Sequence, residues 1–366
     1  MVVNLFKPRF FSYNKEMDDR FATLIDIPDA ILPYLKTRDA KVLNKVNSIQ
    51  DSIMKHTWSY DVYINSVIDT SELTRLRLVG HNPSVNGLSL TPDEKFLLAC
   101  DRFNGHVLVY DATNGNYIRK LTVPNISRYD DVINIHDAVV VPQTGNVLVV
   151  DNDNCYVHVL SGIDDETLVG RIGNGVGKNP SQLLGPNGLD VLNDSSNGPL
   201  VVIADTGNDR LSLFNLENRT LVRNIVGTGP MRLFSKPYQV KVVPETITGK
   251  EAWLAVSEYM ENRCGRIQVL TSEGESIYML SDSPEIPLGF LYGITVSNED
   301  LFVSDVSRQR VVSCRLKDGS GFREVLSRNQ FNIPRGVAVT RNGEQLWVSD
   351  TNKNNRLCLF TIITKL

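Results

Sequence analysis

The sequence predicts an all-β protein: a six-bladed β-propeller of four-stranded antiparallel blades, with an N-terminal strand closing the last blade and an N-terminal helical arm. Six apolar strands each end in an acidic residue, at intervals of 50, 54, 53, 47 and 45 residues, a period typical of propellers. A strand marked by Gly or Pro precedes each of them. A further strand precedes the first repeat. The six acidic residues are Asp101, Asp151, Asp205, Glu258, Asp305 and Asp350.

The third repeat shows the four strands of one blade most clearly. Gly188–Leu192 is the first strand, and a turn rich in Asn, Ser, Gly and Pro follows it, as a hairpin requires. Leu200–Ala204 is continuously apolar, which suits a strand covered on both faces. Arg210–Phe214 alternates, and Leu221–Val226 has the polar face of an outer strand. The repeat therefore predicts a four-stranded antiparallel sheet.

The two ends of the chain predict how the propeller closes. The last repeat reaches its third strand at Arg356–Phe360, and a spare strand of the outer type, Leu73–Val79, precedes the first repeat. Pairing these segments would remove the open edges of the array. We therefore expect residues 1–71 to form an arm and residues 72–366 to form the propeller.

Within the arm, Asp39–His56 has apolar residues at helical spacing, which predicts an amphipathic helix over about residues 39–56. A helix with one apolar stripe must cover something. It would cover either the propeller itself or a partner protein. The candidate docking residues on this stripe are Val42, Val46, Ile49 and Ile53.

The turn after the second strand carries a more specific motif. Asp205-Thr-Gly-Asn-Asp-Arg210, together with an upstream Pro-x-Gly, resembles the NHL repeat over about residues 75–366. Two repeats depart from the pattern, because Asp137 and Gln239 replace the usual Gly. We expect the Arg of each turn to be a structural partner for a nearby acid or carbonyl. These arginines are Arg210, Arg266, Arg310 and Arg356.

The residue before the Gly of each repeat opens the innermost strand and should face the mouth of the central channel. All six are polar or polar-tipped, so they form a candidate site, although such residues also cap strands and bind trapped water. These candidates, called the polar ring below, are Asn86, His136, Asn187, Tyr238, Tyr292 and Arg335.

Two families with related folds place metals at this ring. The amidating lyases hold zinc with three His, whereas this ring has only His136. Gluconolactonase-like propellers hold a divalent cation with Asn and carboxylates. Asn86 and Asn187 match that pattern and the carboxylates are missing, unless Asp137 or Asp130-Asp131 supplies charge. We therefore assign no catalytic residue, no metal ligand and no cofactor.

Composition restricts the function classes and the compartment. The net charge of the 366 residues is −4, so no general nucleic-acid-binding surface is expected. Five widely spaced cysteines favour buried free thiols and a reducing, intracellular compartment. No apolar run would span a bilayer, and no secretory signal is present. The basic start, MVVNLFKPRFFSYNK, is also compatible with a mitochondrial targeting sequence.

The sequence favours a non-catalytic protein–protein interaction module or a subunit of a larger assembly, with the propeller faces and the arm as docking surfaces. The alternative is an enzyme, a metal-assisted hydrolase or lyase at the channel mouth. A second alternative is an RNA-binding NHL domain, against which the lack of basic excess argues. Fold alone does not decide between them.

Overall fold

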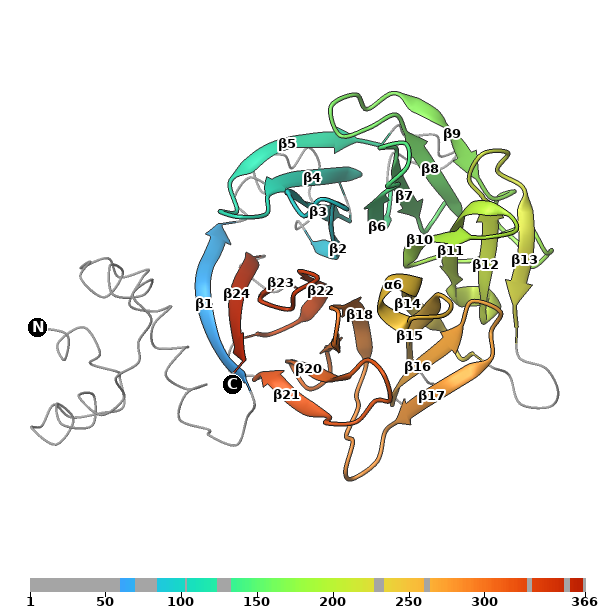
Figure 1. Cartoon of the computed structure of the whole chain (residues 1–366). Helices are drawn as coiled ribbons and strands as arrows, with labels where there is room; N and C mark the ends of the chain where they lie inside the picture. The colour runs from blue at the N-terminus through green and yellow to red at the C-terminus, as the bar shows by residue number, and fades with distance from the viewer. Residues whose placement is uncertain are drawn as a thin grey trace, which may run out of the picture.

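Six four-stranded antiparallel sheets are arranged as blades around a central axis in the computed structural model, as Figure 1 shows. The structure describes residues 60–69, 84–102, 104–123, 133–226, 234–259, 264–327, 331–351 and 356–364. The innermost strands are β2 (Val85–Leu90), β6 (Ile135–Val140), β10 (Leu189–Asp194), β14 (Pro237–Val243), β18 (Leu291–Val296) and β22 (Pro334–Val339).

The second strands of the blades are β3 (Phe96–Asp101), β7 (Val147–Asp151), β11 (Gly198–Asp205), β15 (Trp253–Tyr259), β19 (Asp300–Asp305) and β23 (Gln345–Asp350). The third strands are β4 (His106–Asp111), β8 (Tyr156–Leu160), β12 (Arg210–Asn215), β16 (Gly265–Thr271), β20 (Arg310–Arg315) and β24 (Arg356–Thr364). The outer strands are β5 (Tyr117–Thr122), β9 (Leu168–Ile172), β13 (Leu221–Ile225), β17 (Ser276–Ser281), β21 (Arg323–Leu326) and β1 (Tyr60–Asp69). The predicted propeller of six antiparallel blades is therefore confirmed.

The last blade is closed by an N-terminal strand, as expected, but by a different one from that predicted. β1 pairs antiparallel with β24, from Tyr60 opposite Thr364 to Asp69 opposite Arg356. The reason is a match of length, because the ten residues of β1 run along all nine of β24. The segment Leu73–Val79 and the helix predicted at 39–56 lie outside the described residues.

The hydrophobic core consists of six clusters, each lying between two neighbouring blades. Apolar side chains from the second and third strands of one sheet pack on the innermost strands of the next. Trp347 and Tyr110, both fully buried, belong to the cluster that joins the last blade to the first. Closure of the ring therefore rests on packing between sheets as well as on β1.

The acidic residues that end the second strands hold the turns of their own blades. Asp205 is fully buried, and its carboxylate accepts hydrogen bonds from Leu184 N and Arg210 Nε. The expected structural role of the turn arginines is confirmed for three of them, and the side chain of Arg356 lies outside the described residues. The ion pairs are Arg210 Nε–Asp205 Oδ2 at 2.7 Å, Arg266 Nη2–Glu258 Oε2 at 2.6 Å and Arg310 Nε–Asp305 Oδ2 at 3.3 Å.

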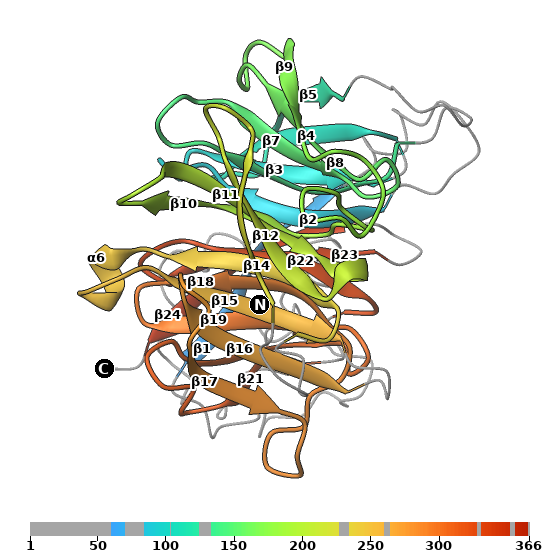
Figure 2. The same cartoon turned by 90° about the vertical axis from the view of Figure 1, so that its right-hand side faces the viewer.

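The inner strands all run in the same direction, so the channel has two distinct ends. The ring mouth lies where these strands begin, and the pocket mouth lies where they end. Two short helices mark the two faces: the 3₁₀ turn η1 (Thr206–Asn208) follows β11 at the ring mouth, and α6 (Glu245–Thr248) follows β14 at the pocket mouth. Figure 2 shows α6 projecting from the pocket face.

All five cysteines are free thiols, and Cys100, Cys155, Cys314 and Cys358 are buried, as their strand positions predicted. Cys264 is half-buried. None of the helices in the described part of the chain has the length and apolar content that crossing a bilayer requires.

Candidate functional site

The polar ring lies on β-bulges at the ring mouth. In five of the six inner strands, the register with the second strand shifts at the ring residue, as between Val85 and Leu88 and between Ile135 and Ala138. A bulge turns a side chain out of the regular alternation and is common next to functional sites. In the remaining blade, Asn187 and Gly188 precede β10 and still bond to Ala204 through the backbone.

Four members of the polar ring form one connected arc. Arg335 Nη1 donates to Asn86 Oδ1 at 2.6 Å across the junction of the last and first blades. The Arg335 guanidinium also lies 5.3 Å from the ring centroid of Tyr292, and Tyr292 lies 4.4 Å from Tyr238 by centroids. The sequence could not show these contacts, because Asn86 and Arg335 are 249 residues apart.

His136 and Asn187 form the second arc of the ring. Asn134 fixes the tautomer of His136: its Oδ1 accepts from Arg102 Nε at 2.7 Å, and its Nδ2 donates to Asp153. The same oxygen lies 3.1 Å from His136 Nε2 and can only accept a hydrogen bond, so that nitrogen carries the proton. Burial, together with the positive charges of Arg102 and Arg335, lowers the pKa of His136 to about 3. His136 is neutral, with a lone pair on Nδ1.

The neighbouring Asn187 also has an acceptor atom without a partner. Asn187 Nδ2 donates to Gly185 O at 3.2 Å and to Thr206 Oγ1 at 2.7 Å, which leaves its Oδ1 as a hydrogen-bond acceptor. Asn187 lies close enough to influence the pKa of His136. Both His136 Nδ1 and Asn187 Oδ1 are buried and have no hydrogen-bond partner among the described residues. A donor, such as a water molecule or a ligand hydroxyl, is needed to satisfy the pair.

The donor set does not fit a divalent metal ion. One imidazole and one amide oxygen carry no charge, whereas hard cations are held mainly by carboxylates. The Asp137 carboxylate is turned away, because its Oδ2 accepts from Gln239 Nε2 at 2.5 Å and from Leu189 N at 3.2 Å. Asp130 and Asp131 lie outside the described residues. Within the described ranges, no three His, Cys, Asp or Glu side chains are grouped as metal ligands.

Beside the polar ring, blades four and five carry an aromatic cluster that sequence analysis missed. Phe290 lies 5.7 Å from Tyr238, 4.6 Å from Tyr259 and 6.3 Å from Tyr292 by ring centroids. Lys236 Nζ lies 5.7 Å from the Tyr259 ring. Tyr238, Tyr259 and Phe290 are half-buried, so part of each ring remains exposed at this face. The signal in the sequence was the aromatic residues at the end of β15 and around the start of β18.

A narrow middle layer separates the two ends of the channel. At the position after the ring residue, four blades have Gly because neighbouring inner strands approach closely: a Cβ on Gly336 would lie 2.3 Å from Asn86 O. The two exceptions to the repeat pattern, Asp137 and Gln239, bond to each other across Gly188. The pair fills the space that the glycines leave, which explains why both blades depart from the repeat together.

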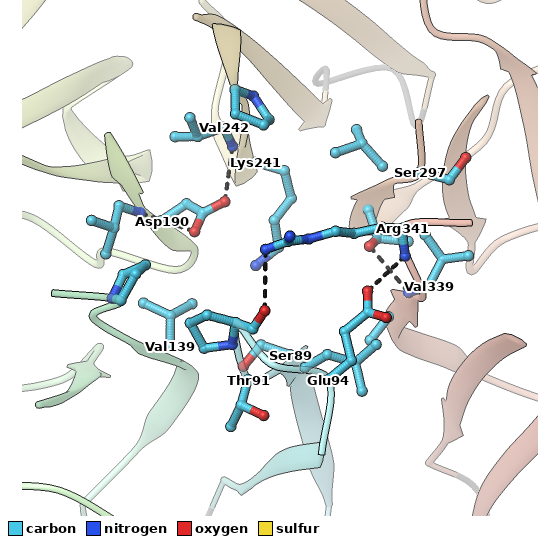
Figure 3. Close-up of a pocket in the computed structure, with 18 of the residues that line it drawn as sticks. Ser89, Thr91, Glu94, Val139, Asp190, Lys241, Val242, Ser297, Val339 and Arg341 are labelled. Atoms are coloured by element: carbon cyan, nitrogen blue, oxygen red, sulfur yellow. Dashed lines mark hydrogen bonds between the residues drawn. The ribbon is translucent and has the colours of Figure 1, made fainter. Parts of the chain in front are cut away.

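The third layer faces the pocket mouth and lines a cavity of about 760 Å³ to which all six blades contribute. Figure 3 shows this pocket, with side chains converging from the inner strands. The layer lies two positions after the middle layer, as the alternation of a strand requires. Its members, called the pocket layer below, are Ser89, Val139, Asp190, Lys241, Thr295 and Ala338.

The comparisons with known proteins agree with this architecture. The family model of the NHL repeat matches residues 331–360. Among solved structures, the chain is similar to a Kuenenia stuttgartiensis hydrazine synthase structure at 12% identity and a TM-score of 0.54, covering 79% of this chain and 98% of that one. Comparison with curated protein sequences finds no match.

Two further structures share the fold. A streptogramin B lyase structure has 11% identity and a TM-score of 0.53, with 83% of this chain and 98% of that chain covered. A PQQ-bound aldose sugar dehydrogenase from Streptomyces coelicolor has 13% identity and a TM-score of 0.54, with the same coverage. At these identities the similarity concerns the fold alone.

Proposed function

We propose that this chain, an NHL-repeat β-propeller, is a non-catalytic protein–protein interaction module or a subunit of a larger assembly, and that its main docking surface is the ring face. The observation that carries the proposal is the aromatic cluster of Tyr238, Tyr259, Phe290 and Tyr292 beside Lys236. Its partially exposed rings are placed on one face of a rigid disc.

Aromatic and arginine side chains are enriched at the centres of protein interfaces, because they bury much apolar area and keep a polar group for orientation. Phe290 contacts three other aromatic rings, so its position is fixed before any partner binds. A preorganised anchor loses little side-chain entropy on association. The exposed edges of Tyr259 and Phe290 are therefore suited to act as anchors.

The contacts of the polar ring support a binding role more than a catalytic one. Arg335 is committed to Asn86 and Tyr292, and the amide of Asn187 is committed to Thr206. These contacts hold the inner strands together and fix the shape of the ring face. The solved structures that share this fold include enzymes, so the fold alone does not decide the function. The proposal therefore rests on the side chains of this chain.

The N-terminal arm is proposed as a second docking surface. Its predicted helix lies outside the described residues, so the proposal rests on the apolar stripe in the sequence. A partner that covers both the ring face and this stripe would bind more tightly than either surface alone allows.

The experiment compares native masses in gentle lysate from the protein's own source, by sedimentation or blue-native electrophoresis. We expect the tagged wild type to migrate in a discrete particle much larger than its own 40.9 kDa. Phe290→Ala and Lys236→Glu should shift the protein to the mass of the free chain. Met279→Ala, at a side chain 50% exposed on the outer strand β17, is the matched control and should stay in the particle.

Circular dichroism shows whether each variant is folded, and Lys236→Glu changes a surface charge without removing a ring from the cluster. Migration of the wild type as the free chain would contradict the proposal. Retention of both folded variants in the large particle would contradict the placement of the docking surface on the ring face.

A further inference from the structure

The pocket mouth carries a second site, at the opposite end of the channel from the polar ring. Its cavity of about 760 Å³ lies within the size range of small-molecule sites. The ends of all six inner strands and the loops after them form its wall. Figure 3 shows labelled side chains from several blades directed toward one space.

Three polar residues of the pocket layer have structural roles. Ser89 Oγ donates to Ala138 O of the next blade. Asp190 accepts from Val191 N at 2.9 Å and from Val242 N at 2.8 Å. Thr295 Oγ1 accepts from Val339 N at 3.3 Å. Each of these side chains therefore joins neighbouring inner strands and has its own hydrogen-bonding capacity at least partly satisfied.

Lys241 is the exception in this layer. The residue is only 8% exposed, and Figure 3 shows its side chain extending into the pocket. No hydrogen bond or ion pair joins its ammonium group to any described residue. An ammonium group has three donors, and burying them without acceptors is costly. The ammonium group therefore takes its acceptor atoms from water or from a ligand inside the pocket.

The charge state of Lys241 is set by two carboxylates. Burial pulls its pKa down, but Asp190 and Asp137 more than offset this, and the pKa lies above its ordinary value. The group is a cation at neutral pH, which suits it to binding an anion and not to nucleophilic attack. The nearby acids also disfavour a doubly charged ligand such as phosphate.

Arg341 supplies a second cation at the same mouth. Its backbone N donates to Glu94 Oε1 at 2.7 Å, and its Nη2 donates to Pro92 O at 3.1 Å. These bonds hold the side chain across the pocket, as Figure 3 shows. The guanidinium keeps further donors for a ligand, because it has five in total.

Apolar side chains form part of the remaining wall, beside polar ones such as Glu94 and Asn193. The apolar part includes Val139, Val242, Val339 and Ala338. We propose that this pocket binds a small organic carboxylate, with the carboxylate at the Lys241 ammonium and a compact apolar body against the valine side chains. The site goes beyond the proposed docking function, because it lies at the other end of the channel and uses none of the aromatic cluster.

The test measures thermal unfolding of the full chain with sodium benzoate, against sodium chloride at the same ionic strength and against the neutral amide benzamide. Benzoate should raise the Tm in a saturable manner, and benzamide should not. Lys241→Met should weaken the apparent benzoate affinity about tenfold or more, because a charge-assisted contact is lost. Lys95→Met is the matched control, at a side chain 72% exposed, and should bind as the wild type does.

A second measurement on the wild type keeps the proposal testable where Lys241→Met does not fold. Benzoate should slow acylation of Lys241 by an amine-reactive reagent severalfold, and leave the rate at Lys95 unchanged, as read by mass spectrometry. No Tm shift with benzoate, an equal shift in Lys241→Met, or unchanged acylation of Lys241 would each overturn the proposal.

The carboxylate could also belong to a polypeptide, and a third arm separates the two sources. The capped peptide acetyl-Ala-Glu-Ala-amide replaces benzoate in the same measurements. Weaker binding than benzoate supports the small-acid proposal. A Lys241-dependent shift with the peptide alone would overturn it and assign the pocket to an acidic side chain of a partner.

Discussion

The two ends of the channel differ in how their polar groups are satisfied. At the ring mouth, bulges bring Asn86, Arg335 and Tyr292 into contact across blade junctions. At the pocket mouth, regular strands place Lys241 in a cavity where its ammonium has no hydrogen-bond partner among the described residues. The same repeat thus produces one end where His136 and Asn187 lack a hydrogen-bond donor and one end where Lys241 lacks acceptors among the described residues.

This difference separates structural polar groups from ligand-facing ones. Polar character alone predicts neither role, because both layers of the channel are partly polar. A group whose hydrogen bonds are complete stabilises the fold, and a buried group whose hydrogen bonds are incomplete marks a place for water or a ligand. The predictions below compare variants at the two ends.

The largest loss is expected from the buried ion pair on the ring side. Asp205→Ala leaves Arg210, 7% exposed, without its counter-ion, and should reduce the free energy of unfolding by about 3–5 kcal/mol. Urea unfolding of the purified protein measures it. Asp93→Ala removes an exposed ion pair with Lys95 and should cost less than about 1 kcal/mol. Equal losses would show that the turn pair is not structural.

Arg335→Met should reduce the free energy of unfolding by about 1–3 kcal/mol, because the fully buried Asn86 Oδ1 loses its donor. The variant also loses the contact of the guanidinium with the Tyr292 ring. Urea midpoints of wild type and variant at neutral pH provide the measurement. An unchanged midpoint would mean that the ring contacts do not stabilise the fold.

Neutral His136 should make the protein sensitive to acid. Its pKa of about 3 lies below the ordinary 6.5, so the unfolded chain binds the proton more tightly. The stability that comes from keeping His136 neutral is complete above pH 6.5, and it is lost as the pH falls toward 3. By about pH 5 the loss in the free energy of unfolding is about 2 kcal/mol. His136→Gln should remove that part of the loss, as urea midpoints at about pH 7.5 and about pH 5 would show.

Other titrating groups cancel in that comparison, because they are present in both proteins. Asp101 is one of them, since burial raises its pKa to about 6 and its effect has the opposite sign. His106 is another, since burial lowers its pKa to about 4 and its effect has the same sign. Lys95→Met serves as a control, because its urea midpoint should change with pH as that of the wild type does. If the urea midpoint of His136→Gln changes with pH as much as that of the wild type, the neutral, buried imidazole is contradicted.

The smallest effect on stability is expected at Lys241. Lys241→Met should change the free energy of unfolding by less than about 1 kcal/mol, because relief from burying a charge opposes the loss of attraction to Asp190 and Asp137. Urea unfolding without added ligand measures it. A loss as large as that of Arg335→Met would indicate that Lys241 is a structural residue.

The sequence predicted the blades well, because they follow from a fixed period. The polar ring stays a candidate site. It did not identify the closing strand, since Tyr60–Asp69 and Leu73–Val79 both have strand-like sequences and the pairing with β24 is visible only in the structure. The predicted helix over residues 39–56 and its docking residues stay predictions.

The sequence also did not predict the contacts that give each site its character. Arg335 and Asn86 meet only because the ring closes, and Phe290 joins aromatic residues from another blade. Lys241 had a detectable signal, because a lysine stands between two valines in the inner strand PYQVKVV. Its role depends on whether neighbouring groups accept hydrogen bonds from its ammonium group, and a sequence pattern cannot show that.

The most direct test of the contrast between the two ends is a high-resolution crystal structure of the full chain, with attention to Lys241 Nζ. We expect Arg335 to contact Asn86 directly, and the Lys241 ammonium to be bound by ordered water or a ligand carboxylate inside the pocket. A direct ion pair of Lys241 with Asp137 or Asp190, or a lysine turned out to bulk solvent, would contradict the account.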